Sequence, residues 1–437
     1  MKFIQYIIYS ILIVFLLGPF FAFFSTKFLD RNFLYLLAGV IYLVTTVKIL
    51  EIITGSGKVI IPKYLKFYGL FVLYTVLSDI FIVGKSIDFK YFYSSDYIAS
   101  LSLLFLVENI EITSAFKETC KKIFLFVVTI ALFVIIMQEL VNPYFFADPS
   151  FYSMWPGMSR DELQLPSIFA WVEGVTVNIS FLAMLSLLLG EYIPLHNKVK
   201  IFNLYFWGGI FAFLSKGRSI MINFLLLFFM NFMTGGITEK FKKIMVWALI
   251  LLIVSVSTVA VLKSLNVPVD EIVMNRILEE NAGGLGSGAS ESRILSFFVF
   301  AELFPEHPVF GKGEFHTFGE VSGDFELQTL LVGKSSQIHV GYLSLLYYYG
   351  IVGGLLYFLF AYFLMKDFYN VAKKTSRWGP FFVFVGFLFI NFTLVYLPLY
   401  DIGLIMAFVF HNYYKKESEG SGGDMDNGEK NLVYANS

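Results

Sequence analysis

Arginine is the residue type whose distribution along this sequence points to chemistry. Only six of the 32 basic residues are arginines, and a guanidinium group is a planar fork of donors that fits phosphate oxygens in two-point contacts. Under the topology argued below, most lysines lie on the cytoplasmic side of the membrane. Five of the six arginines lie on the opposite, outer side: Arg31, Arg160, Arg218, Arg276 and Arg293. This distribution indicates an outward-facing site for a phosphorylated ligand, with anchoring to lipid headgroups as the alternative for each arginine.

Arg218 is the strongest single candidate for binding that ligand. It lies in FLSKGRSIM, between two apolar stretches at 201–215 and 219–234. Each stretch would be roughly 23 Å long as a helix, against a hydrocarbon core of roughly 30 Å. The tip of the hairpin should therefore lie below the outer surface, where Lys216 and Arg218 need a water-filled cavity or an anionic partner.

His339 is the candidate for moving a proton. It begins a long apolar stretch, 338–365, which would be roughly 42 Å long as one helix and must then tilt or project outward. Either arrangement leaves His339 at the outer mouth of the bundle, where a neutral imidazole could take a proton from a hydroxyl group. The alternative is that His339 is an interfacial residue that takes no part in catalysis. We expect His196 and His411 to be interfacial residues of that kind.

Glu173 is the candidate carboxylate. It lies a few residues into the apolar stretch 168–190, where a charge is costly unless it is paired or faces a cavity. We expect it either to hold an arginine in place or to contact the substrate. A polar group that only packs between helices is an equal alternative.

Metal, nucleotide and nucleic-acid binding find no support in the sequence. His307 and His316 are nine residues apart with no carboxylate in fixed relation to them, which is poor evidence for a metal. The single cysteine, Cys120, excludes disulfides and thiolate metal sites. The glycine clusters GGLGSG and GKGEFHTFG lack the phosphate-loop pattern, and a net charge of −1 gives no hint of nucleic acid. We expect no metal and no cofactor.

The elements that must position these residues are membrane helices. Apolar residues make up 57% of the chain and aromatic residues 19%, with a mean hydropathy of +0.72, well outside the soluble range. Apolar stretches of spanning or near-spanning length recur throughout. We predict an all-α integral membrane bundle of about twelve spans: 4–24, 33–53, 64–84, 92–107, 123–141, 168–190, 201–215, 219–234, 244–262, 338–365, 379–396 and 400–413.

The positions of the basic residues set the orientation of this bundle. With a cytoplasmic N-terminus, the inside segments hold roughly three times as many lysines and arginines as the short outside loops, which predicts that both termini are cytoplasmic. The membrane domain would cover 1–414 and include one large outward loop, 263–337. A helix at 290–304, stopped by Pro305, would be interfacial or docked on the bundle. The polar tail, 415–437, would be a disordered cytoplasmic end.

Taken in order, these signals resemble the O-antigen polymerase and O-antigen ligase superfamily of bacterial membrane proteins. Three segments carry the resemblance: LSKGRSIMI (214–222), SRILSFFVFAELFPEHPVFGKG (292–313) and IHVGYLSLLYYYGIVGG (338–354). The last segment is the most specific of the three.

The family pattern in that last segment is a histidine, a polar residue, nine further residues, a glycine, two residues and a second small residue. His339, Gly350 and Gly353 match this spacing. Val340 departs from it, which puts in doubt any role of that side chain in orienting an acceptor. The arginines of the family's short hairpin and loop helix correspond to Arg218 and Arg293.

The resemblance implies a glycosyltransferase that uses undecaprenyl-pyrophosphate-linked oligosaccharides as donor and acceptor at the outer face of the plasma membrane. An acceptor hydroxyl assisted by His339 would attack the anomeric carbon, while Arg218 and Arg293, with Arg160, would bind the pyrophosphate leaving group. Because arginines supply the positive charge, this scheme needs no metal. Further candidates for substrate binding are Lys216, Glu173 and Arg276. Membrane lipid and a chain-length regulator protein are the expected partners.

Three functions compete within this interpretation. We favour a polymerase, which joins repeat units into O-antigen, capsular or exopolysaccharide chains. A ligase would instead transfer the lipid-linked glycan to a lipid A core by the same chemistry. A transporter or flippase for the lipid-linked sugar is the third, but the chain shows no pairing of two six-span halves, and the late loop at 263–337 breaks the symmetry of repeat-built transporters.

Overall fold

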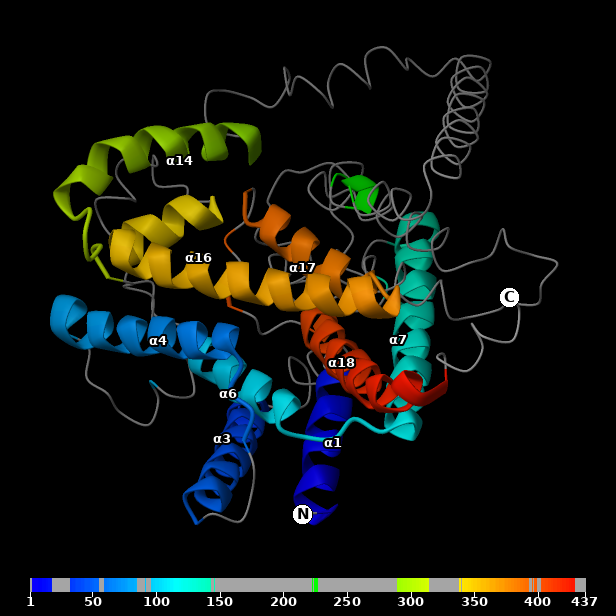
Figure 1. The fold of residues 1–437 in the computed structure, drawn as a ribbon. Coiled ribbons are helices and arrows are strands. Elements are labelled where there is room, and N and C mark those ends of the chain that lie inside the picture. Colours follow the sequence, from blue (N-terminus) through cyan, green and yellow to red (C-terminus); the bar gives the residue numbers. More distant parts are fainter. Residues whose placement is uncertain are drawn as a thin grey trace, which may run out of the picture.

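The structure is a computed structural model, and it is helical in the parts of the chain that it describes. These are 2–17, 32–54, 59–84, 96–142, 289–313, 340–392 and 402–428, with isolated positions at 91, 145, 222, 224–226, 338, 395 and 397–398. No strand occurs among these residues. Figure 1 shows the helices: α1 (Lys2–Leu16), α3 (Asn32–Ile53), α4 (Lys63–Ser78) with the π-helical turn η1 (Asp79–Val83), α6 (Asp96–Glu108), α7 (Ser114–Leu140), α14 (Ala289–Leu303) with the 3-10 turn η3 (Phe304–Glu306), α16 (Gly341–Thr375), α17 (Gly379–Ile390) and α18 (Ile402–Gly428).

Most of these helices coincide with predicted apolar spans, because long runs without charged residues satisfy their backbone groups only as helices in a bilayer. Within the described residues, three are long and apolar enough to cross a membrane: Lys63–Val83, Ser114–Leu140 and Gly341–Thr375. The described part of the chain is all-α and includes helices of membrane-spanning length and composition, as predicted. The total of about twelve spans stays a prediction, since those at 168–190, 201–215 and 244–262, and most of 219–234, lie outside the described residues.

α16 folds back on itself at Gly350 (Figure 1). The backbone there has φ 62° and ψ −168°, a conformation open in practice only to glycine. Residues equally distant from Gly350 meet: a Cβ on Gly354 would lie 2.6 Å from the side chain of Leu346, and the rings of Tyr342 and Phe358 are 5.6 Å apart. The prediction of one continuous helix is therefore wrong. α16 consists of a half-helix, 341–349, and a long arm, 351–375.

α4 packs along α16 through a layer of aromatic rings. The ring centroids of Tyr68 and Phe360 are 4.6 Å apart, and the Phe71 ring forms edge-to-face pairs with Tyr349 at 5.7 Å and Tyr357 at 5.3 Å. Such edge-to-face arrangements are the favourable ones for aromatic pairs. Because Tyr349 ends the half-helix and Tyr357 belongs to the long arm, Phe71 supports both sides of the fold-back.

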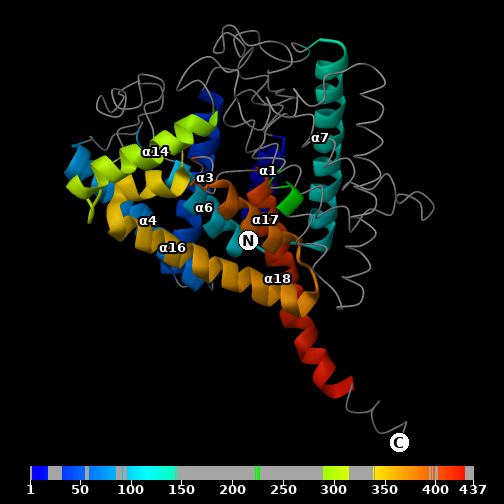
Figure 2. The same ribbon diagram turned by 90° about the horizontal axis from the view of Figure 1, so that it is seen from above.

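α7 stands on the other side of the described bundle, away from α4 (Figure 2). It begins at Thr113, whose side-chain oxygen accepts a hydrogen bond from the Phe116 backbone N–H, as helix N-caps commonly do. α7 contacts α1 and α18, and the ring of Phe116 stacks on Tyr9 of α1 at 3.7 Å. This contact ties the first helix of the chain to the bundle.

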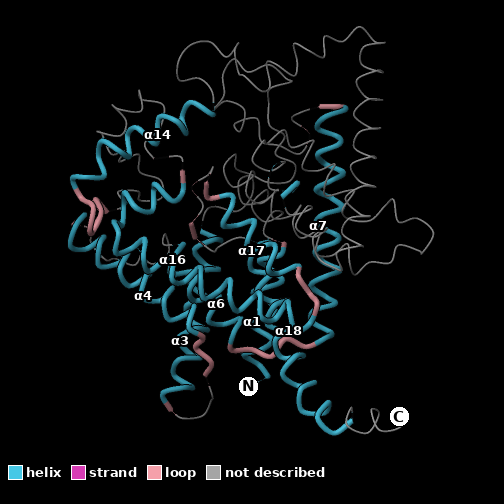
Figure 3. The backbone as a smooth tube through the Cα atoms, turned by 45° about the horizontal axis from the view of Figure 1, so that its top comes forward, coloured by secondary structure: helices cyan, strands magenta, loops and turns pink. Residues whose placement is uncertain are grey.

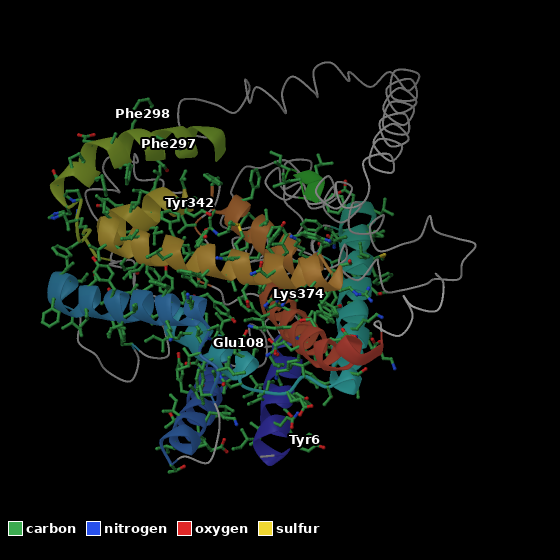
Figure 4. The ribbon with its side chains drawn as sticks, in the orientation of Figure 1. Tyr6, Glu108, Phe297, Phe298, Tyr342 and Lys374 are labelled. Atoms are coloured by element: carbon green, nitrogen blue, oxygen red, sulfur yellow. The ribbon has the colours of Figure 1, made fainter. Side chains whose placement is uncertain are left out.

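A buried charged cluster joins α4, α6, α16 and α18, and Figure 4 labels one of its members, Glu108. The Tyr64 hydroxyl donates to Glu108. Lys415 Nζ lies 3.1 Å from Asp367 Oδ2 and 4.0 Å from Glu108 Oε2, and His411 Nε2 lies 3.0 Å from the same Asp367 oxygen. His411 is 1% exposed, so the prediction that it is an ordinary interfacial residue is wrong: it is buried against a carboxylate from another helix.

α18 continues as a helix to Gly428, into the tail for which the sequence predicts disorder from Lys415 onward. Its polar residues find partners there: Lys416 Nζ donates to the Ile110 carbonyl, and the Ser418 hydroxyl donates to the Lys415 carbonyl. Burial alone would lower the pKa of Lys415, but the carboxylates of Glu108 and Asp367 outweigh burial and raise it above its ordinary value. These contacts extend the helix past the apolar stretch.

Candidate functional site

A short loop, 307–313, crosses the fold-back of α16, and we call it the strap. It follows α14 and η3, where Pro305 ends the helix as predicted. Figure 3 shows the strap in pink between α14 and the fold-back. Four backbone hydrogen bonds fasten it to α16: Lys312 N to Tyr347 O at 3.0 Å, Gly313 N to Tyr348 O at 2.8 Å, Ile351 N to Pro308 O at 2.9 Å and Val352 N to Val309 O at 3.1 Å. They satisfy the carbonyls and amides that the broken helix cannot pair within itself.

Two glycines make this close contact possible. A Cβ on Gly311 would lie 2.3 Å from the Tyr348 carbonyl oxygen, and a Cβ on Gly350 would lie 2.3 Å from the Val309 carbonyl oxygen. Both residues also have positive φ, 75° and 62°. The backbones of strap and fold-back can therefore approach only where neither carries a side chain.

α14 is docked on the bundle by one side only. It contacts α16 and buries Ser296, Val299 and Leu303, whereas Phe297 and Phe298 are 56% and 69% exposed. Figure 4 shows Phe298 on the side of α14 that faces away from α16. The sequence left open whether this helix is interfacial or docked, and the structure shows it docked with aromatic side chains on its outer side.

The π-helical turn η1 reaches the strap from α4. A Cβ on Gly313 would lie 2.3 Å from the Val83 side chain, so the strap lies between the half-helix and η1. Asp79, the first residue of η1, is 7% exposed and accepts a hydrogen bond of 2.8 Å from the Tyr91 hydroxyl. Such π-helical turns are frequent at functional sites.

The strap, α14 and the half-helix all fall inside the part of the chain that matches a known family. Residues 203–358 match the family model described as O-Antigen ligase. The matched region supports a relationship to the O-antigen polymerase and ligase superfamily. This confirms the resemblance expected from the three motif segments. No curated protein matches the chain. The match covers about a third of the chain and ends at Phe358, the residue that packs on Tyr342 across the fold-back.

Within the matched region, α14, which includes position 293, contacts α16, whose half-helix follows His339 in the sequence. Arg293 lies on α14, although its side chain is outside the described residues. His339 is itself outside them, but it directly precedes the half-helix, and its neighbours Ile338 and Val340 are 0% and 3% exposed. α14 contacts α16, and the strap connects them. α14, which bears Arg293, and the half-helix, which follows His339, are therefore held together.

The start of the half-helix packs against α17. The Tyr342 hydroxyl donates to the Leu388 carbonyl at 2.6 Å, and the Tyr342 ring lies 4.8 Å from Phe392. The half-helix therefore starts beside the C-terminal end of α17 and beside the long arm at Phe358. Its N-terminal, electropositive end is directed back along the bundle.

The remaining predicted site residues lie outside the described residues, and the structure does not test them: Arg160, Glu173, Lys216, Arg218 and Arg276. Sequence reasoning assigned no role to Asp79, although a carboxylate inside an apolar span is a signal of function. It also gave no role to Ser78 or Ser344, whose hydroxyls are buried without a hydrogen-bond partner among the described residues. Serines in apolar helices are too common to single these two out.

Proposed function

We propose that this chain is a membrane glycosyltransferase that joins undecaprenyl-pyrophosphate-linked oligosaccharide repeat units into a bacterial surface polysaccharide. The observation that supports it most is the family match over 203–358, which contains the strap between the Arg293 helix and the half-helix after His339. Reaction at the outer face of the plasma membrane, with both termini cytoplasmic, belongs to the same proposal.

The proposed reaction is a direct displacement at the anomeric carbon. The acceptor hydroxyl oxygen forms a bond to that carbon while the bond between the carbon and the pyrophosphate oxygen breaks. His339 takes the hydroxyl proton. The leaving group departs as undecaprenyl pyrophosphate, and its negative charge is stabilised by Arg218 and Arg293.

The other candidate residues assist binding in this scheme. Arg160, Arg276 and Lys216 contribute positive charge around the pyrophosphate, since several cations distribute over its oxygens. Glu173 holds one of these cations or accepts hydrogen bonds from the glycan. The exposed outer side of α14, with Phe297 and Phe298, is suited to contact with lipid.

A polymerase and a ligase differ only in the acceptor. The proposal favours the polymerase because the chain is rich in aromatic residues, 19% of the total, which can stack on sugar rings of a long acceptor. The ligase remains the runner-up, because the chemistry is shared and the matched family model is described as O-Antigen ligase.

Reconstitution of the purified chain tests the proposal. In vesicles supplied with lipid-linked repeat units alone, a polymerase produces a ladder of longer lipid-linked chains. A ligase produces nothing until lipid A core is added, and a flippase moves the substrate across the bilayer without lengthening it. His339→Ala is the control for chemistry. Either of the last two results would replace the polymerase assignment.

A further inference from the structure

Tyr74 of α4 meets the strap and the fold-back at one point. Its hydroxyl lies 2.7 Å from the Phe310 carbonyl oxygen and 3.1 Å from the Tyr349 carbonyl oxygen. Phe310 belongs to the strap, and Tyr349 is the last residue of the half-helix. The single hydroxyl hydrogen is shared between the two carbonyls, so one side chain fastens both segments to α4.

The space for the Tyr74 ring is made by Gly353, one turn into the long arm. A Cβ on Gly353 would lie 2.9 Å from Cε1 of Tyr74 and 2.4 Å from Cβ of Tyr349. Gly353 has no positive φ, so its backbone does not require glycine. Instead, the lack of a side chain at Gly353 leaves room for Tyr74 and Tyr349.

The two glycines of the sequence pattern thus have different tasks. Gly350 permits the fold-back and the approach of the strap, and Gly353 admits the Tyr74 ring. Phe71, one turn before Tyr74 on α4, forms an edge-to-face pair with Tyr349. α4 therefore fixes the end of the half-helix both by packing and by a hydrogen bond.

We propose that Tyr74 is a positioning residue that locks the strap to the half-helix, and so holds the Arg293 helix in a fixed relation to the half-helix that follows His339. This rests on the proposed function, because it assumes that these two residues act on one substrate. The observation behind this proposal is that one hydroxyl group bonds to both the strap and the half-helix. A tyrosine that served packing alone would not need a hydrogen bond to both segments.

Tyr74→Phe tests the lock, because it keeps the ring in the space left by Gly353 and removes only the shared hydrogen. Hydrogen–deuterium exchange of the purified protein should be at least about tenfold faster in peptides covering 308–313 and 347–354. Tyr68→Phe is the matched control: it removes a hydroxyl on the same helix, bonded to Ser100 at 2.6 Å, and should leave exchange at the strap unchanged.

The same variants test the link to turnover. Loss of one hydrogen bond that orients reacting groups should lower kcat of Tyr74→Phe by about five- to tenfold, with KM for the lipid-linked donor changing less than kcat. Gly353→Ala should act in the same direction by crowding the Tyr74 ring. Gly354→Ala should be milder, since its Cβ would come closer than 3.8 Å only to the flexible end of the Leu346 side chain.

The outcomes separate the two claims. Unchanged exchange at the strap in Tyr74→Phe would overturn the lock, whatever the activity. Faster exchange with wild-type kcat would overturn the positioning role. A wild-type protein that yields neither polymer nor ligated product would overturn the proposed function, and with it the part of Tyr74 in that reaction, even where the strap is protected from exchange.

Discussion

Gly311 of the strap and Gly350 of α16 lie backbone against backbone. At each glycine, the backbone around the other glycine fills the space that a side chain would need. The relation is reciprocal: the carbonyl that excludes a Cβ on Gly311 belongs to Tyr348, two residues before Gly350, and the one that excludes a Cβ on Gly350 belongs to Val309, two residues before Gly311. The contact therefore fixes the register of the strap on the fold-back. A shift by one residue would place a side chain between the two backbones.

Gly350→Ala should destabilise the protein and abolish activity. The φ of 62° with ψ of −168° costs a residue with a side chain about 1–3 kcal/mol, and the overlap with Val309 adds to this. Thermal unfolding can be followed through the single thiol, Cys120, which is 0% exposed and becomes reactive as the protein opens. Gly69→Ala is the control, since nothing lies within 4 Å of that Cβ. An equal melting temperature for both variants would contradict the fold-back.

Lys415→Met should lower stability by about 1–3 kcal/mol, because it removes a cation that lies 3.1 Å from Asp367 and 4.0 Å from the buried carboxylate of Glu108. This loss of stability is smaller than for a fully buried ion pair, because the side chains of Lys415 and Asp367 are 21% and 27% exposed. Lys122→Met, an exposed position on α7, should change stability by less than about 0.5 kcal/mol.

The pH dependence of the Lys415 contribution follows from the direction of its pKa. Since the pKa of Lys415 is raised in the folded protein, its stabilising effect is fully present below the ordinary lysine value of roughly 10.4 and is lost only as pH rises through the higher folded value. The difference in melting temperature between wild type and Lys415→Met should therefore be constant from about pH 6 to 9. A difference that vanishes within that range would show that the cluster does not hold this charge.

The helices could be predicted from sequence, whereas the contacts that shape the site could not. α14 was predictable within a residue or two, because SRILSFFVFAELF has no breaker before Pro305. The fold-back was not, because an apolar stretch that contains glycines has the pattern of a continuous span. The backbone of Gly350 is set by the strap, which comes from a separate segment. The pattern of apolar residues in 338–365 gives no sign that the strap will pack against it.

The same reason explains the two side chains whose roles were missed. Tyr74 is 236 residues from Phe310 in sequence, and a tyrosine in a chain with 26 of them has no distinguishing pattern. His411 looked interfacial because it ends an apolar stretch, but its partner Asp367 comes from the far end of α16. Both roles depend on which helices pack together.

Arg218→Lys should be nearly as damaging as Arg218→Ala. Lysine keeps the positive charge but loses the planar pair of donors that binds two phosphate oxygens at once. Polymer formation in cells is the measurement, with the protein level checked by immunoblot. Full activity of the lysine variant would reduce Arg218 to a general source of positive charge at the site.

His339→Ala should lower turnover by roughly two to four orders of magnitude while the protein still inserts and binds the lipid-linked substrate. If the imidazole is the general base, it must be neutral to accept the acceptor's proton, so wild-type activity should fall on the acid side of an ordinary histidine pKa of roughly 6.5. That acid limb should be missing from the residual activity of the alanine variant. The half-helix should keep its place, because the Tyr342 hydroxyl still donates to the Leu388 carbonyl, so the melting temperature serves as the control for folding. Near-normal product with an unchanged acid limb would mean that His339 is only an interfacial residue, and that the arginines alone carry the catalysis.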